Sequence, residues 1–145
     1  MEVPAQAADH VFEKEFVRGA VLLTEMQFPN GTKKSKYIIV LNKTPADSAT
    51  LLFLTTSQTD FYNRHQGLDH VRLQANSLSC FPKETIIDCR KIWPMDRVSL
   101  KKRYQQGTLK FVGLLPQNYV EQIDRLVTSS RFISLRHKKA ILGWL

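Results

Sequence analysis

Two neighbouring apolar runs decide the fold of this chain: KKSKYIIVLN, residues 33–42, and ATLLFLTTSQ, residues 49–58. Both runs are rich in residues that favour strands, and both are far shorter than the roughly 18 to 20 apolar residues of a membrane-spanning helix. Lysine side chains lead into the first run, and hydroxyl side chains end the second. The connection between them contains Pro45 and has no room for a crossover helix, so we expect two adjacent antiparallel strands.

Further strands are expected on both sides of this pair. The alternation of apolar and polar residues places strands at 20–28, 37–41, 50–55, 70–74, 85–93 and 108–112. We expect a turn at residues 29–31, a basic loop at 33–36, a polar loop at 58–69 and an end to the fifth strand at Pro94. Tyr119, Ile123 and Leu126 then predict an amphipathic helix behind Pro116. Ser134 is expected to cap a second helix, which ends near Gly143.

These elements predict one mainly β domain over residues 1–145, a small barrel or curled sheet with helices at its C-terminal end. A hydrophobic content of 43% is enough for a single core. We divide the domain into an N-terminal extension (1–17) with a short helix packed on the edge, a barrel (18–112) and C-terminal helices (113–145).

The composition favours an anionic partner. Lys and Arg total 21 against 13 Asp and Glu, a formal net charge of +8. The basic residues gather at 33–36, 97–103 and 131–139, although a solvated surface explains any one cluster equally well. Cys80 and Cys89 are too few for a disulfide framework, and the N-terminus lacks a signal pattern. We therefore expect a cytoplasmic protein without a membrane span.

Most enzyme signatures are absent from the sequence. There is no Gly-rich phosphate loop, no Gly-x-Ser-x-Gly elbow and no His-Glu-x-x-His motif. The four histidines do not fall at metal-ligand spacing, so we expect neither a metal nor a cofactor. His65 and His70 are possible acids or bases, but loop histidines of this kind are usually solvated.

The two opening runs also bring a cation and hydroxyl groups together. Antiparallel pairing sets the start of the first strand beside the end of the second, which brings Lys36 near Thr56 and Ser57. Cleaving RNA without a metal needs a cation beside the scissile phosphate and a polar group that moves a proton. The competing interpretation is that Lys36 is a charge at a strand entry and that the hydroxyls merely end a strand.

The order of several short motifs resembles the MazF/PemK-like toxin family over roughly residues 18–140. The motifs are Arg18-Gly19 before a strand, a loop with Gly31, a basic-then-apolar strand, Leu54-Thr55-Thr56-Ser57, Ile86-Ile87-Asp88 and Gly113-Leu114-Leu115-Pro116 before a helix. The resemblance implies an SH3-like small β-barrel with C-terminal helices that forms a homodimer. It also implies cleavage of single-stranded RNA without a metal, a cyclic phosphate product and inhibition by an antitoxin with a disordered, often acidic segment.

The resemblance further implies which residues act. The family's catalytic arginine, normally followed by proline, falls on Lys36-Tyr37, and its catalytic Thr or Ser falls on Thr56, with Ser57 adjacent. Beside these catalytic positions, the residues expected to hold RNA are Lys33, Lys34, Arg64, Arg90 and Lys91. Two aromatic residues after Ser57, Phe61 and Tyr62, either stack bases or close one end of the barrel.

The lysine at position 36 keeps two alternatives open, because it lacks the planar donor fork with which arginine holds a phosphate. The first is a non-catalytic module of the same fold that binds RNA or a protein. The second is a CcdB-like toxin that acts on gyrase through its C-terminal helix, with which Trp144 is compatible.

Overall fold

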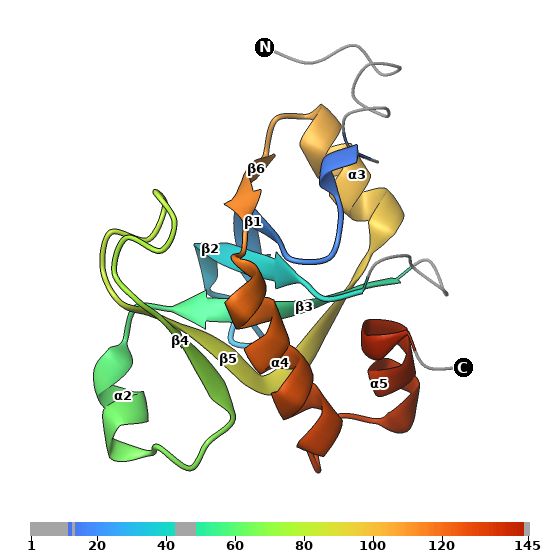
Figure 1. The fold of residues 1–145 in the computed structure, drawn as a ribbon. Coiled ribbons are helices and arrows are strands. Elements are labelled where there is room, and N and C mark those ends of the chain that lie inside the picture. The colour runs from blue at the N-terminus through green and yellow to red at the C-terminus, as the bar shows by residue number, and fades with distance from the viewer. Residues whose placement is uncertain (1–11, 13, 43–48, 144–145) are drawn as a thin grey trace.

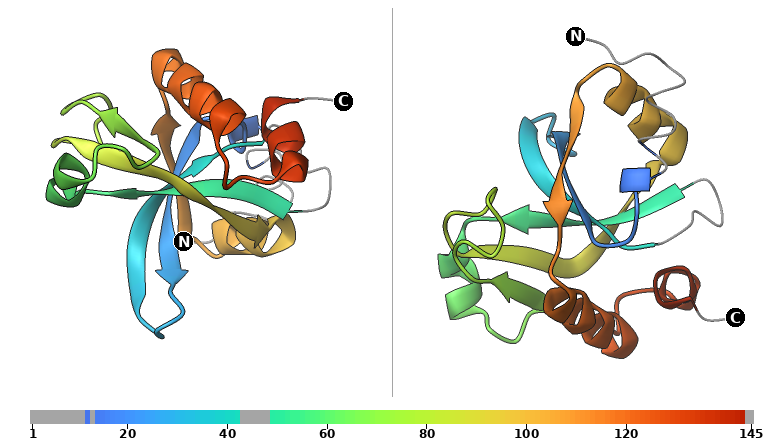
Figure 2. Two further views of the ribbon diagram at one scale, coloured as in Figure 1. Left: turned by 90° about the horizontal axis from the view of Figure 1, so that it is seen from below. Right: turned by 45° about the horizontal axis from the view of Figure 1, so that its top comes forward.

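The computed structural model describes residues 12, 14–42 and 49–143, which form a six-stranded antiparallel sheet with helices around it (Figure 1). The strands are β1 (Ala20–Gln27), β2 (Lys33–Val40), β3 (Ala49–Thr56), β4 (His70–Leu73), β5 (Thr85–Asp96) and β6 (Leu109–Leu114). They pair in the order β4-β5-β3-β2-β1-β6, so β4 and β6 form the edges. The helices are α2 (Thr59–Arg64), α3 (Arg97–Gln105), α4 (Gln117–Ser129) and α5 (Leu135–Leu142). The protein is thus mainly β, and its sheet is curled into a half-barrel (Figure 2).

Hydrophobic clusters cover both faces of the sheet. Helices α4 and α5 lie on one face and α3 on the other (Figure 2). Because successive strand residues point to opposite faces, Ile39 of β2 joins the cluster with α4 and Ile38 joins the cluster with α3. The apolar run of β3 is buried from Thr50 to Thr55 for the same reason, since both of its faces are covered.

The N-terminal segment contributes to the second cluster. Phe12 and Phe16 stack with their ring centroids 4.4 Å apart and are buried against the sheet. Their spacing of four positions brings them together on one face of a helical turn. Residues 1–11 and 13 of the predicted extension lie outside the described residues.

Hydrogen bonds at Gly19 link the start of β1 to the end of β2 and to the segment that leads into α4. The Gly19 N–H donates to the Val40 carbonyl, and the Gly19 carbonyl accepts from the Leu115 N–H, both at 2.8 Å. Gly19 has a φ of +85°, which side chains other than glycine rarely adopt. Beside it, Arg18 forms an ion pair with Asp124 of α4. These contacts hold α4 against the start of β1.

The predicted strands and C-terminal helices are confirmed, including the helix caps. The Ser134 hydroxyl accepts a hydrogen bond from the His137 N–H at 3.2 Å, and Gly143 ends α5 with a φ of +72°. In the described part of the chain, no helix combines the length and apolar character that crossing a membrane requires.

Three expectations about secondary structure are wrong. Residues 33–36 are not a loop but the first half of β2, because the ladder with β1 continues to Lys33 opposite Gln27. The expected polar loop at 58–69 contains α2, which buries Tyr62. Strand β5 runs through Pro94 to Asp96, with Pro94 opposite Leu51.

Helix α3 was not predicted, because it carries almost no apolar periodicity. Leu100 is its buried residue, Val98 is apolar but exposed, and most of the other residues are polar or charged. Asp96 caps it by accepting a hydrogen bond from the Ser99 N–H at 3.3 Å. The basic cluster at 97–103 therefore lies largely on this helix, on the α3 side of the sheet.

Candidate functional site

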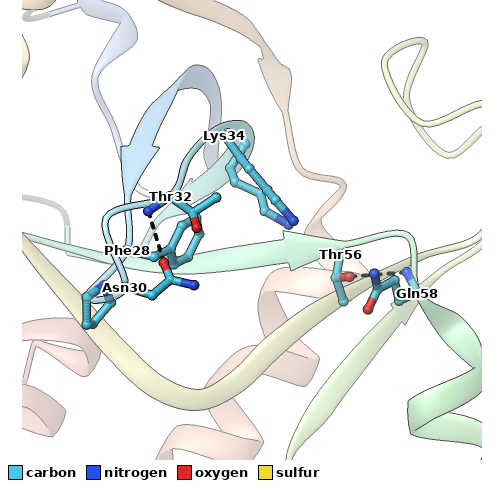
Figure 3. A pocket seen from close by; sticks show the side chains of 8 residues that line it. Phe28, Asn30, Thr32, Lys34, Thr56 and Gln58 are labelled. Atoms are coloured by element: carbon cyan, nitrogen blue, oxygen red, sulfur yellow. Dashed lines mark hydrogen bonds between the residues drawn. The ribbon is translucent and has the colours of Figure 1, made fainter.

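Three adjoining hollows open where β2 begins and β3 ends, and Lys36 and Thr56 line all three. The first, of about 490 Å³, reaches the tip of the β1–β2 hairpin at Phe28 and Asn30 (Figure 3). The second, of about 430 Å³, follows β5 from Asp88 to Trp93. The third, of about 300 Å³, continues past Ser57 to residues 80–83. These volumes suit small ligands, and together they suit an extended ligand that crosses Lys36.

Strand register brings Lys36 and Thr56 to one face. The β2–β3 ladder ends with Ile38 paired to Leu54, and Lys36 and Thr56 each lie two residues beyond that last pair, lining the same three hollows. Side chains two residues apart along a strand point to the same side of the sheet, so Lys36 and Thr56 lie on the side of the Ile38 and Leu54 side chains. On its other flank, Lys36 pairs with Thr24 of β1. The structure therefore brings the two residues together, while their catalytic roles stay predictions.

The Lys36 ammonium is available to an anion. No hydrogen bond or ion pair links it to another residue within the described ranges, although the side chain is partly buried. Burial, and secondarily the charge of Lys34, lower the pKa of Lys36. Both effects disfavour its charged form, so an anion in the hollow would relieve them.

The Thr56 side chain is oriented by a backbone N–H two residues further along the chain. Its Oγ1 accepts a hydrogen bond from the Gln58 N–H at 3.1 Å, as Figure 3 shows. The hydroxyl proton donates to no described residue and is free for a ligand. Thr55, in contrast, is buried and donates to the Tyr37 carbonyl at 2.8 Å, which makes it a structural residue. Ser57 is exposed and lines only the third hollow.

The two predicted RNA-binding lysines on β2 point to opposite faces. Lys34 shares the face of Lys36 and lines the first hollow, where Figure 3 shows its ammonium directed toward the side of Thr56. Lys33 is exposed and lines none of the three hollows. A phosphate chain along the first hollow would therefore meet Lys34 before Lys36.

Arg90 and Asp88 neutralise each other beside the second hollow. The Arg90 Nε and Nη2 each donate to the Asp88 carboxylate at 3.0 Å. Burial alone would raise the pKa of Asp88, but the hydrogen bonds and charge of Arg90, aided by Tyr62, lower it. The Arg90 guanidinium also lies 5.4 Å from the Phe61 ring centroid and 5.5 Å from that of Tyr62. Arg90 would have to give up its contacts with Asp88 before its guanidinium could bind a phosphate through two N–H donors.

The candidate RNA-contacting residues after Ser57 lie in and just after α2, and they divide into buried and exposed side chains. Tyr62 is only 2% exposed and fits the expected plug better than a base-stacking surface. Phe61 is 36% exposed and stacks on His65 at 4.5 Å. Arg64 lies exposed at the end of α2, outside the three hollows. A ring nitrogen of His65 and one of His70 each pair with a nearby carbonyl oxygen, and neither histidine lines any of the three hollows.

Sequence reasoning missed the irregularity of β5 that shapes the second hollow. Leu54 pairs with Asp88 and Leu52 with Trp93, so Phe53 alone faces the segment 89–92. Such a bulge bends the strand and redirects its side chains. It places Lys91 and Trp93 in the same hollow as Lys36. The signal was present in the sequence, because Arg90 and Lys91 are consecutive charges that break the alternation of a regular strand.

Comparison with known proteins adds no relative. No protein-family model matches the chain, and no curated protein matches it. The family assignment therefore stays a prediction that rests on the motifs and on the geometry around Lys36.

Among the described residues, no group of three or more His, Cys, Asp or Glu side chains is placed to hold a metal ion.

Proposed function

We propose that this protein is a metal-independent endoribonuclease of the MazF/PemK type, built on an SH3-like small barrel, that cuts single-stranded RNA. The observation that carries the proposal is the Lys36 ammonium, which is partly buried, has no partner among the described residues and lines the same three hollows as Thr56. A cation held in this way attracts a phosphate group. The adjoining hollows leave room for the chain on both sides of that phosphate.

The proposed reaction is an intramolecular transfer. The ribose 2′ oxygen attacks phosphorus, the bond to the 5′ oxygen breaks, and the products are a 2′,3′-cyclic phosphate and a 5′ hydroxyl. Lys36 stabilises the negative charge that develops on the phosphate oxygens. Thr56, or its neighbour Ser57, passes a proton to the departing 5′ oxygen and recovers one from water. Water also takes up the proton that the 2′ hydroxyl loses, so the proton balance closes.

The surrounding cations hold the RNA in this proposal. Lys34 contacts the strand in the first hollow and Lys91 in the second, while Lys33, Arg64 and Arg90 act at the rim. The formal net charge of +8 supports both an RNA substrate and an inhibitory antitoxin with an acidic segment. The proposal further includes a homodimer and a cytoplasmic location, as the family resemblance implies.

Cleavage in the presence of a chelator tests the proposal. The purified protein is incubated with a long single-stranded RNA in EDTA, and the fragment ends are analysed for cyclic phosphate. We expect cleavage that Lys36→Ala and Thr56→Ala each abolish. Intact RNA with excess protein, from a preparation free of any co-purified partner, would refute the proposal. Variants that cut as fast as the parent would place the site elsewhere.

A non-catalytic RNA-binding module is the second candidate, and one observation favours it. The guanidinium beside the site, that of Arg90, is already paired with Asp88, so Lys36 offers a point charge without a bidentate partner. In this case RNA binds to the protein and stays intact over hours. Growth arrest with DNA breaks and intact RNA would instead indicate the gyrase-directed toxin.

A further inference from the structure

An aromatic pair lies within the second hollow, away from the hydroxyl of Ser57. Phe28, just after β1, and Trp93, from β5, meet edge to face, with centroids 5.7 Å apart and an interplanar angle of 81°. Both residues are half-buried. They share this hollow of about 430 Å³ with Lys36 and Thr56. Two aromatic rings, both packed against the cluster on the α3 side of the sheet, therefore adjoin the cation and hydroxyl of the candidate site.

A lysine side chain lies over the Trp93 ring and can be displaced by a ligand. The Lys91 ammonium lies 4.3 Å from the ring centroid, a cation–π contact. At an exposed position such a contact contributes little, and Lys91 is exposed. Stacking of a nucleobase on an aromatic ring is stronger. A base can therefore displace the ammonium, which remains near enough to meet the phosphate attached to that base.

We infer that Phe28 and Trp93 form a subsite for one unpaired nucleobase of the strand whose phosphate binds Lys36. This inference rests on the proposed function for the direction of the strand, but it concerns binding and not cleavage. Aromatic rings next to cations match a nucleotide, because each nucleotide presents a planar base and an anionic phosphate. Paired bases are stacked inside a duplex and cannot reach the rings, so the subsite selects single strands.

The bulge in β5 explains why the subsite exists. A regular strand would continue the pairing register from Asp88, and Trp93 would then lie beyond the reach of Leu54 and its neighbours. The extra residues at 89–92 bring Trp93 opposite Leu52 and place Lys91 on the rim. Charge and aromatic surface thus come from one irregular segment.

Binding of an uncleavable strand tests the inference. Trp93 and Trp144 are the two tryptophans of the chain, so Trp144→Phe leaves Trp93 as the sole tryptophan fluorophore. We expect a short single-stranded DNA, which lacks the 2′ hydroxyl, to quench Trp93 fluorescence. An abasic oligomer with the same number of phosphates should bind about 5- to 150-fold more weakly, the range that loss of one stacked base produces.

Substitutions then locate the effect, with affinity followed by anisotropy of a labelled strand. Trp93→Leu should reduce the ratio of base-bearing to abasic affinity to nearly one, and Trp93→Phe should keep most of it. The control is Phe132→Leu, which removes an aromatic residue that is 81% exposed and outside the hollows. Equal affinity for the two oligomers in the parent protein, or an unchanged ratio in Trp93→Leu, would overturn the inference.

The same experiment separates the inference from the proposed function. If the strand binds through its bases but RNA stays intact, the endoribonuclease proposal fails and the subsite stands. If RNA is cut but the abasic oligomer binds as well as the other, the subsite fails and the nuclease stands. Stronger competition by an acidic peptide than by the DNA strand would assign the hollow to a protein partner and overturn the inference.

Discussion

Replacing Lys36 by methionine separates a catalytic lysine from a structural one. The substitution keeps the length and apolar stem of the side chain and removes only its charge and donors. Loss of one donor that stabilises charge in a transition state lowers rates by about 100- to 1000-fold. We expect a loss of this size in single-turnover cleavage of RNA.

The same variant should fold at least as well as the parent. Burial lowers the pKa of Lys36, which means that the folded protein disfavours the charged form relative to the unfolded chain. Below that lowered pKa the charge reduces stability, and methionine removes the reduction. Because the side chain is only partly buried, we expect the free energy of unfolding to be unchanged or to rise by at most about 0.5 kcal/mol.

The assay compares Lys36→Met with the matched variant Lys110→Met. Lys110 is exposed on β6, paired with Leu23, and lines none of the three hollows. Both variants are assayed in EDTA after thermal and urea unfolding have shown that they are folded. Cleavage by folded Lys36→Met within a few-fold of the parent would refute our reasoning. Equal losses in the two variants would instead indicate a general effect of net charge.

Three other outcomes follow from the same structure. Thr56→Val keeps the shape of the residue and removes the free hydroxyl, so cleavage in the single-turnover assay should fall about 100-fold while RNA binding stays within a few-fold; unchanged cleavage would exclude a role for this hydroxyl. The cleavage rate should fall as pH rises through the lowered pKa of Lys36, since the ammonium is present only below it, and a pH–rate profile of Lys36→Arg should lose this basic limb if that variant is active. Thr50→Val should raise the free energy of unfolding in urea by about 1 kcal/mol, because the buried Thr50 Oγ1 has no hydrogen-bond partner in the described part of the chain; a loss of stability would mean that an internal water satisfies that hydroxyl.

Local patterns predicted most of the strands because burial acts on each residue directly. The continuous apolar run of β3 indicated a strand covered on both faces, and the alternation in β1 and β4 indicated strands of the same sheet. The stripe through Tyr119, Ile123 and Val127 predicted α4 equally well. Helix α3 has no such apolar stripe and was not predicted. Its single buried leucine and its Asp96 cap form no repeating pattern of apolar residues that the sequence could reveal.

The candidate site shows the same division. The antiparallel logic of the two opening runs was enough to place Lys36 near Thr56, since the start of one strand lies beside the end of the other, and Ile38 indeed pairs with Leu54. Sequence patterns also indicated the excess of positive charge that such a site would use. They did not indicate which basic side chains are already paired with a carboxylate, because the pairing of Arg90 with Asp88 depends on how β5 bends.

The sequence by itself therefore determined the strands, the C-terminal helices and the pairing that brings an ammonium to a hydroxyl. Only the tertiary structure decided that β2 begins at Lys33, that β5 bulges opposite Phe53, and that Phe28 meets Trp93 beside Lys36. The physical reason is the distance along the chain over which each kind of interaction acts. Burial and propensity act on neighbours along the chain, whereas a bulge and a contact between residues 28 and 93 depend on packing across the whole sheet.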